Sequence, residues 1–231
     1  MRNMRKAGEG MNRYDVCIFD LDGTLIDSLG DLADSCNRAL RLHGMPVHDI
    51  DKYRYFVGSG IKNLIRRSLA EKGSDEKLVD SVFLSFNSIY EANCLVRTKP
   101  YSNIKQMLMR IKQQGVKVCV LSNKSDEFSK MITDRLFDEG TFDIVWGKKP
   151  DYPIKPDPTA LHAMLDMLSM SREKCLYIGD SDVDCITAQN AGVDFMGVEW
   201  GFRGREELLS AGAKVIASSP WDIAKAVCGD E

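Results

Sequence analysis

Four short apolar runs, each ending abruptly in polar residues, constrain the fold of this chain more than any other feature. They span Tyr14–Phe19, Val116–Leu121, Phe142–Trp146 and Cys175–Ile178. Their β-branched and aromatic residues are typical of buried strands. The segments between them carry apolar residues at spacings of three and four, which predict amphipathic helices. Strands that alternate with helices predict an α/β fold, a Rossmann-like parallel sheet with helices on both faces.

The stretch from Ser28 to Thr98 departs from this alternation. Its apolar residues recur at helical spacing, and no convincing strand interrupts them. We therefore predict an inserted helical domain over residues 28–98 and an α/β core built from residues 1–27 and 99–231, with a frayed tail over the first ten residues. We expect strand-free connectors at both ends of the insert, which would let it move over a site.

The composition indicates an ordinary globular protein and argues against two kinds of partner. The chain has 231 residues, of which 44% are hydrophobic and 28% charged, as in ordinary globular proteins. Its 31 basic and 34 acidic residues give a net charge of −3, too little positive charge to favour nucleic acid or an anionic membrane surface. We expect neither partner. No uncharged apolar run approaches the roughly 18 residues of a spanning helix.

The cysteines and the first residues bear on the compartment. Seven cysteines are scattered and form no C-x-x-C pair, which favours reduced, buried side chains over disulfides or a zinc site. The basic residues near the start are not followed by the roughly 7 to 15 apolar residues of a signal peptide. Together these features predict a cytoplasmic protein.

Two carboxylates, Asp20 and Asp22, follow the first apolar run and are followed in turn by Gly23 and Thr24. In a parallel sheet the polar ends of the strands share one edge, so all four polar clusters are expected to converge there. Two buried carboxylates repel each other, and a hard cation such as Mg²⁺, which takes oxygen ligands, would relieve that repulsion. The alternative is that these acids form a helix cap or an Asx turn.

More acids follow the last apolar run, in Gly179-Asp-Ser-Asp-Val-Asp184. Asp180 and Asp184 suit metal binding and would supply ligands that the first cluster lacks. A calcium-binding EF-hand loop is the competing interpretation, but neither the glycine nor the final glutamate of that loop is present. Asp182, at the start of a predicted helix, is better explained by an interaction with the helix dipole.

Two further clusters offer groups that could bind a phosphate. Ser122 and Asn123 follow the second apolar run, where a hydroxyl and backbone N–H groups at a helix start would either hold a phosphate or cap the helix. Lys155 lies among prolines in Pro153-Ile-Lys-Pro-Asp-Pro158, whose stiff backbone would fix the ammonium. Such a cation would neutralise an aspartate and a transferring phosphoryl group, whereas most lysines are solvated.

Together the four clusters resemble the motifs of the haloacid dehalogenase superfamily, in particular its phosphatase branch similar to phosphoglycolate phosphatases. The motifs are D-x-D-G-T, a strand-end Ser or Thr, a Lys before Pro, and G-D-S-x-x-D. They occur here in order at Asp20–Thr24, Ser122, Lys155 and Gly179–Asp184. The insert that follows the first motif resembles the α-helical cap of this group, and the resemblance extends from Tyr14 onward.

The resemblance implies a Mg²⁺-dependent phosphatase that acts on a small phosphorylated metabolite, with 2-phosphoglycolate as the first candidate, through an aspartyl-phosphate intermediate. Asp20 would be the nucleophile and Asp22 the general acid and base. Lys155 would offset the charge of the transferring group. The acid at Asp22 separates this chain from the dehalogenases of the superfamily, which lack it.

The resemblance also implies which residues bind the metal and the phosphate. The expected Mg²⁺ ligands are Asp20, the main-chain carbonyl of Asp22 and Asp180, with Asp184 contributing through the second sphere or through water. The expected phosphate-binding residues are Ser122, Asn123 and Lys155.

The same motifs leave other functions open. A pyrophosphatase, a nucleotidase or a sugar phosphatase would use them equally, and only the cap would differ. A β-phosphoglucomutase-like phosphomutase would need acid/base and sugar-binding groups from the cap that the sequence does not reveal. A non-catalytic binding module is disfavoured because the acids and the lysine are all intact.

Specificity is expected to reside in the cap. Lys62, Arg66 and Arg67 would either reach the substrate or form the solvated face of an amphipathic helix. Trp200 and Phe202, beyond the last motif, are predicted to be packing groups.

Overall fold

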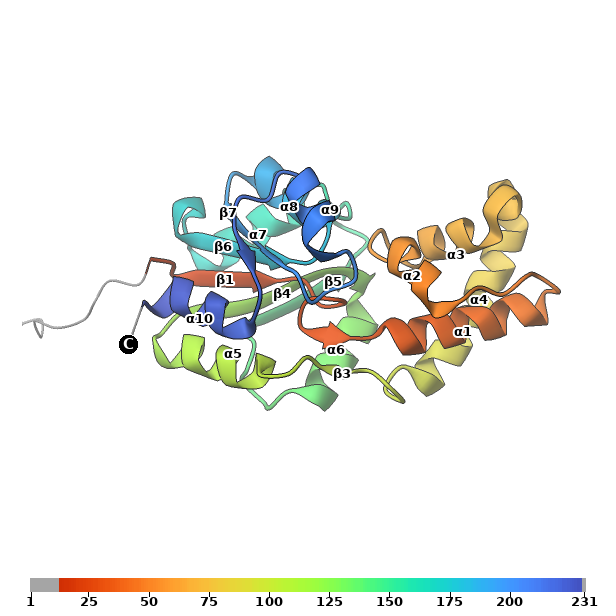
Figure 1. Cartoon of the computed structure of the whole chain (residues 1–231), viewed down its shortest axis with the longest axis horizontal. Coiled ribbons are helices and arrows are strands. Elements are labelled where there is room, and N and C mark those ends of the chain that lie inside the picture. The colour runs from red at the N-terminus through yellow and green to blue at the C-terminus, as the bar shows by residue number, and fades with distance from the viewer. Residues whose placement is uncertain (1–12, 230–231) are drawn as a thin grey trace, which may run out of the picture.

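Six parallel strands form the central sheet, in the order β5-β4-β1-β6-β7-β8 (Figure 1). The structure is a computed structural model that describes residues 13–229, so the predicted tail lies outside the described residues. The strands are β1 (Val16–Phe19), β4 (Lys117–Ser125), β5 (Ile144–Lys148), β6 (Cys175–Gly179), β7 (Asp194–Val198) and β8 (Ile216–Ala217). The α/β prediction is therefore confirmed, and β7 and β8 extend the four predicted strands.

Both faces of the sheet are covered, because alternate residues of each strand enter different apolar clusters. In β1, Cys17 and Phe19 face one cluster, whereas Val16 and Ile18 face the other. Helices α5 (Ile104–Gln113), α6 (Asp126–Leu136) and α10 (Pro220–Cys228) contribute to the first cluster, and α7 (Thr159–Leu168) and α8 (Asp182–Ala191) to the second. Burial on both sides explains why this strand is apolar throughout.

The predicted helical insert contains four helices that pack on one another beside the carboxyl edge of the sheet (Figure 1). They are α1 (Leu29–Leu42), α2 (Ile50–Phe56), α3 (Ile61–Leu69) and α4 (Glu76–Asn93), with a 3₁₀ turn at Ala70–Ser74. Their apolar residues continue the cluster on the first face of the sheet. The division into domains at residues 27/28 and 98/99 stays a prediction.

The prediction of strand-free connectors is wrong. β2 (Ile26–Asp27) and β3 (Lys99–Pro100) pair antiparallel at the two ends of the insert. Two residues are too few to show an alternating pattern, so the local sequence could not reveal these strands. The buried Asp31 carboxylate also links the two ends of the insert. It accepts hydrogen bonds from the backbone N–H groups of Arg97 and Thr98 at 2.9–3.0 Å and from the Thr98 hydroxyl at 2.7 Å.

The second predicted strand is longer than expected. β4 continues past Leu121 to Ser125, with an irregular register against β5 between these two residues. Helix α6 begins only at Asp126, where the Ser125 hydroxyl caps it by accepting a hydrogen bond from the Phe128 N–H. The prediction of a helix start at Ser122 is wrong because polar side chains that normally end a strand are buried here within it.

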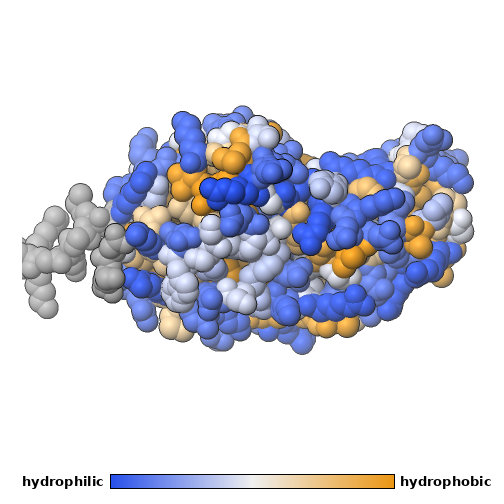
Figure 2. All heavy atoms as spheres, in the orientation of Figure 1, coloured by the Kyte–Doolittle hydropathy of each residue, from blue (hydrophilic) through white to orange (hydrophobic). Residues whose placement is uncertain are grey.

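The surface shown in Figure 2 is mostly hydrophilic, with hydrophobic residues in small separate groups. Across residues 13–229, no helix is long and apolar enough to cross a membrane. The seven cysteines, all within residues 13–229, form no disulfide, and six of them are buried, as the sequence predicts.

Candidate active site

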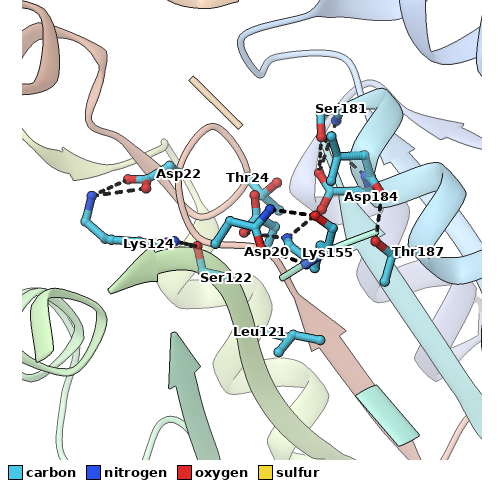
Figure 3. A network of polar contacts seen from close by, with 12 residues as sticks. Asp20, Asp22, Thr24, Leu121, Ser122, Lys124, Lys155, Ser181, Asp184 and Thr187 are labelled. Carbon is cyan, nitrogen blue, oxygen red and sulfur yellow. Dashed lines mark hydrogen bonds and ion pairs between the residues drawn. The ribbon is translucent and has the colours of Figure 1, made fainter. Parts of the chain in front are cut away.

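The four predicted polar clusters meet at the carboxyl edge of the sheet (Figure 3). Asp20 follows β1, Ser122 lies within β4, Lys155 lies between β5 and α7, and Asp180 follows β6. A pocket opens between this edge and the inserted helices. Its lining residues come from both sides: Asp20, Asp22, Ser122, Asn123, Lys124 and Asp180 from the strand ends, and Val57, Gly58, Gly60, Ile61 and Leu64 from the insert.

Lys155 is buried between two carboxylates, with 4% of its surface exposed. Its Nζ atom lies 2.9 Å from Asp20 Oδ1 and 2.7 Å from Asp184 Oδ1, and it donates a hydrogen bond to the Tyr177 hydroxyl at 2.9 Å. Burial lowers the pKa of an ammonium, but the charges of Asp184 and Asp20 outweigh it and raise the Lys155 pKa well above its usual value. Lys155 is therefore a fixed cation and not a solvated surface lysine.

Asn123 holds the backbone around Lys155. The Lys155 N–H donates to Asn123 Oδ1 at 2.9 Å, and Asn123 Nδ2 donates to the carbonyl oxygens of Lys155 at 3.0 Å and Gly58 at 2.9 Å. These three bonds connect β4, the Lys155 loop and the inserted helices. Because they engage the side-chain amide, a phosphate at this position would contact the backbone of Asn123. Ser122 and Asn123 both line the pocket.

Three buried acids are close enough to hold one metal ion. One carboxylate oxygen from each of Asp20, Asp180 and Asp184 lies within 4.8 Å of the others. Burial, helped by repulsion from Asp184, raises the pKa of Asp20 to about 6, although Lys155 acts to lower it. Burial and the charges of Asp184 and Asp20 also raise the pKa of Asp180 well above its usual value. An all-oxygen cluster that resists ionisation suits a hard divalent cation such as Mg²⁺.

The three acids differ in how far their oxygens are already engaged. Asp184 Oδ1 pairs with Lys155, and its Oδ2 accepts hydrogen bonds from the Ser181 hydroxyl at 2.6 Å and N–H at 3.2 Å. Within the described residues 13–229, each oxygen of Asp180 accepts one hydrogen bond, from the Thr24 hydroxyl at 3.2 Å and from the Phe202 N–H at 2.7 Å. This pattern favours Asp180 as a direct ligand and Asp184 as an outer one.

Two glycines allow Asp180 to approach. A Cβ atom on Gly23 would lie 2.3 Å from Asp180 Oδ2, and one on Gly201 would lie 2.2 Å from Asp180 Cβ. Gly23 also has a φ of +88°, which other residues rarely adopt. The glycine of D-x-D-G-T is therefore required by the contact between the first and the last motif.

Asp22 lies apart from the three-acid cluster and faces Lys124 (Figure 3). Its carboxylate accepts a hydrogen bond of 2.5 Å from the Ser28 hydroxyl and pairs with Lys124 Nζ at 3.0 and 3.1 Å. The Lys124 side chain is only 1% exposed. Burial lowers the pKa of this ammonium, but the charge of Asp22 more than compensates and the Lys124 pKa lies above its usual value.

Comparison with known proteins identifies the family of this chain. Residues 17–198 match the family model of haloacid dehalogenase-like hydrolases. The chain belongs to this family. It is 35% identical over 210 residues to a phosphoglycolate phosphatase of Aquifex aeolicus, covering 91% of the chain and 95% of the relative. It is 31% identical over 207 residues to a phosphoglycolate phosphatase of Colwellia psychrerythraea, covering 87% and 92%.

Solved structures agree with this assignment. A crystal structure from Lactobacillus delbrueckii subsp. bulgaricus, provisionally named a phosphoglycolate phosphatase, superposes with a TM-score of 0.88 at 32% identity, covering 95% of the chain and 100% of the other. The resemblance seen in the sequence and the predicted fold of this hydrolase are both confirmed.

Lys124 and Arg203 line the pocket of the hydrolase without having been predicted to do so. Phe202 was predicted to pack, yet its N–H also binds Asp180. Arg203 donates to the carbonyl oxygen of Val57 at 3.2 Å, which joins the core to the insert. No local pattern pointed to Lys124, because the polar residues from Ser122 onward do not resemble a strand, whereas β4 continues to Ser125.

The three basic residues of the insert that were candidates for substrate binding do not line the pocket. Lys62 pairs with Asp80 at 2.6 Å and Arg66 with Glu76 at 2.8 Å, and neither lines the pocket. Arg67 donates to the carbonyl oxygens of Tyr55 and Phe56. These contacts favour the solvated helix face over a role in substrate binding. Trp200 packs as predicted and donates its Nε1–H to the Thr24 carbonyl at 3.1 Å.

Mg²⁺ is expected to raise the Tm of this hydrolase, and to do so more at about pH 7.5 than at about pH 5. A cation at about 100 times its Kd adds about 2.7 kcal/mol, which corresponds to roughly 5–10 °C for a chain of this size. The Asp20 pKa of about 6 lies above its unfolded value, so near pH 5 the carboxyl holds a proton that the cation must displace. Thermal unfolding with Mg²⁺ or EDTA at both pH values measures this, with Asp180→Asn as the variant in which the shift shrinks. Equal shifts at the two pH values would contradict the expectation.

Proposed function

We propose that the protein is a Mg²⁺-dependent phosphatase that hydrolyses 2-phosphoglycolate through an aspartyl-phosphate intermediate. The observation that carries the reaction is the buried ion pair of 2.9 Å between Lys155 and the pocket residue Asp20, beside two further acids. The substrate rests on relatives named phosphoglycolate phosphatase, which are similar to most of this chain. A small phosphorylated substrate is also consistent with a pocket that residues of the insert line on one side.

In the first step, an Asp20 carboxylate oxygen attacks phosphorus in line with the ester oxygen. The new P–O bond to Asp20 forms as the bond to the leaving oxygen breaks, and Asp22 gives that oxygen a proton. Lys155, held between Asp20 and Asp184, offsets negative charge as the phosphoryl group moves. The Ser122 hydroxyl and the backbone N–H groups beside it bind the phosphoryl oxygens.

In the second step, Asp22 takes a proton from a water molecule that attacks the phosphorus of the aspartyl-phosphate. The P–O bond to Asp20 breaks, and Asp20 leaves as a carboxylate together with inorganic phosphate. Asp20, the main-chain carbonyl of Asp22 and Asp180 would hold Mg²⁺, which would supply charge neutralisation on the phosphoryl group. Asp184 orients Lys155 and supports this site through its hydrogen bonds with Ser181.

Phosphate release from a substrate panel tests the proposal. The panel contains 2-phosphoglycolate, pyrophosphate, a nucleoside monophosphate and a hexose phosphate, each with Mg²⁺ or with EDTA. Mg²⁺-dependent release with the highest kcat/KM for 2-phosphoglycolate is the expected result. Highest activity on another member would replace the substrate while keeping the reaction, and no release from any of them would overturn the proposal.

Asp22→Asn is expected to slow alkyl phosphates much more than aryl phosphates. General acid catalysis contributes about 10²- to 10⁴-fold when the leaving oxygen needs a proton, and far less when it leaves readily as an anion. We therefore expect a loss in that range with 2-phosphoglycolate and a loss of about tenfold or less in the phosphorylation step with 4-nitrophenyl phosphate. Pre-steady-state release of 4-nitrophenol isolates that step. Equal losses on the two substrates would remove the general-acid role of Asp22.

A further inference from the structure

We propose that Lys124 binds the anionic group of the substrate's leaving portion and so selects substrates like 2-phosphoglycolate over uncharged phosphate esters. This inference rests on the proposed phosphatase function and adds a specificity residue to it. It comes from a buried ammonium at the pocket that the mechanism above does not use.

The first support is the position of Lys124 relative to the leaving oxygen. Its Nζ atom lies 3.0 Å from Asp22 Oδ2, and both residues line the pocket. If Asp22 hydrogen-bonds the leaving oxygen, that oxygen and the ammonium lie on either side of one carboxylate, about 5 Å apart. In 2-phosphoglycolate a single methylene separates the ester oxygen from the carboxylate. The substrate carboxylate can therefore reach ion-pair distance of Lys124.

The second support is the environment of the ammonium. Tyr90 of α4 covers it, with the ring centre 4.8 Å from Nζ, and the nearby pocket wall is apolar at Val57, Ile61 and Leu64. Water is largely excluded, so a charge pair formed here is stronger than one at the surface. A neutral leaving group would leave this ammonium with no new partner.

The third support is that Lys124 can exchange partners without leaving Asp22 bare. Asp22 also accepts the 2.5 Å hydrogen bond from the Ser28 hydroxyl, which does not depend on Lys124. A substrate carboxylate can therefore share or replace the contact with the ammonium while Ser28 keeps Asp22 in place.

The other cations near the pocket are committed elsewhere. Lys155 lies between Asp20 and Asp184 at 2.9 and 2.7 Å. Arg203 donates to the Val57 carbonyl at 3.2 Å and pairs with Glu207 at 3.3 Å. Lys124 is the cation whose acid partner faces the leaving group.

The test compares three esters with the same two-carbon skeleton: 2-phosphoglycolate, ethyl phosphate and 2-aminoethyl phosphate. For the wild type, kcat/KM is expected to fall about 100-fold from the anionic to the neutral ester, and further for the cationic one. Lys124→Met should lower the anionic-to-neutral ratio to about fivefold or less, because it slows 2-phosphoglycolate much more than ethyl phosphate. Lys117→Met is the matched control, because Lys117 starts the same strand and pairs with Asp143 at 3.0 Å, away from the pocket. Equal losses on both esters, or a wild type that does not distinguish the three charges, would overturn the inference.

A binding measurement keeps this inference separate from the proposed function. Calorimetric Kd values for 2-phosphoglycolate and ethyl phosphate are measured with Mg²⁺ in the Asp20→Asn protein, with and without Lys124→Met. Loss of the preference for the anionic ligand on adding Lys124→Met supports the role of Lys124, and an unchanged preference overturns it. If the wild type released no phosphate from any ester, the proposed function would fail. The ratio of the two Kd values, with and without Lys124→Met, would still decide the inference.

Discussion

Asp20→Asn is expected to lower kcat by about 10⁴-fold or more while the protein stays folded. The amide cannot supply the anionic oxygen that attacks phosphorus, yet it has nearly the same shape as the carboxylate. Its oxygen keeps a partial negative charge beside the Lys155 ammonium, which lies 2.9 Å from Asp20 Oδ1. Losing one of three buried acids also relieves repulsion with Asp180 and Asp184, so Tm without metal should not fall.

Phosphate release and thermal unfolding of the purified variant measure the two parts of this result. Asp182→Asn is the matched control, because it removes a neighbouring acid at the start of α8 that lies outside the metal-binding cluster. Its kcat should stay within about threefold of the wild type, as a helix-end charge contributes only about 0.3–1 kcal/mol. An Asp20→Asn protein that turns over at more than a tenth of the wild-type rate would exclude Asp20 as the nucleophile.

Lys155→Met is expected to abolish measurable turnover and also to destabilise the protein by about 3–5 kcal/mol, the cost of breaking a buried ion pair. The substitution keeps the length of the side chain but leaves Asp20 and Asp184 without their shared cation. At about 2–4 °C per kcal/mol for a chain of this size, Tm should fall by roughly 6–20 °C. The loss arises from stranded charges and not from a cavity.

The double variant Lys155→Met/Asp184→Asn separates these causes. Removing the charge of Asp184, which is fully buried, should restore about half of the lost Tm but none of the activity. Thermal unfolding and phosphate release of the single and double variants form the experiment. If the second substitution made the protein still less stable, the unpaired carboxylates would not be the source of the defect.

The sequence predicts those elements of the fold whose pattern of apolar residues lies within one short segment. Each strand that is buried on both faces needs an unbroken apolar run, and β1 and β6 show it directly in the sequence. The paired strands β2 and β3 have no such signal, because two residues carry no period and their pairing joins positions more than 70 residues apart. The predicted strand ends at Leu121, four residues before the end of β4, because the last residues of β4 are polar although most of them are buried.

The sequence by itself determined the parallel α/β sheet and the presence of Asp20, Ser122, Lys155 and Asp180 at one edge of it, because strand polarity alone brings such residues together. Only the tertiary structure decided what each group contacts. In the folded protein the side-chain amide of Asn123 hydrogen-bonds the Lys155 backbone, and Lys124 forms an ion pair with Asp22. Those pairings join residues 32 and 102 positions apart, and buried charges choose partners by distance in space, which no local pattern encodes.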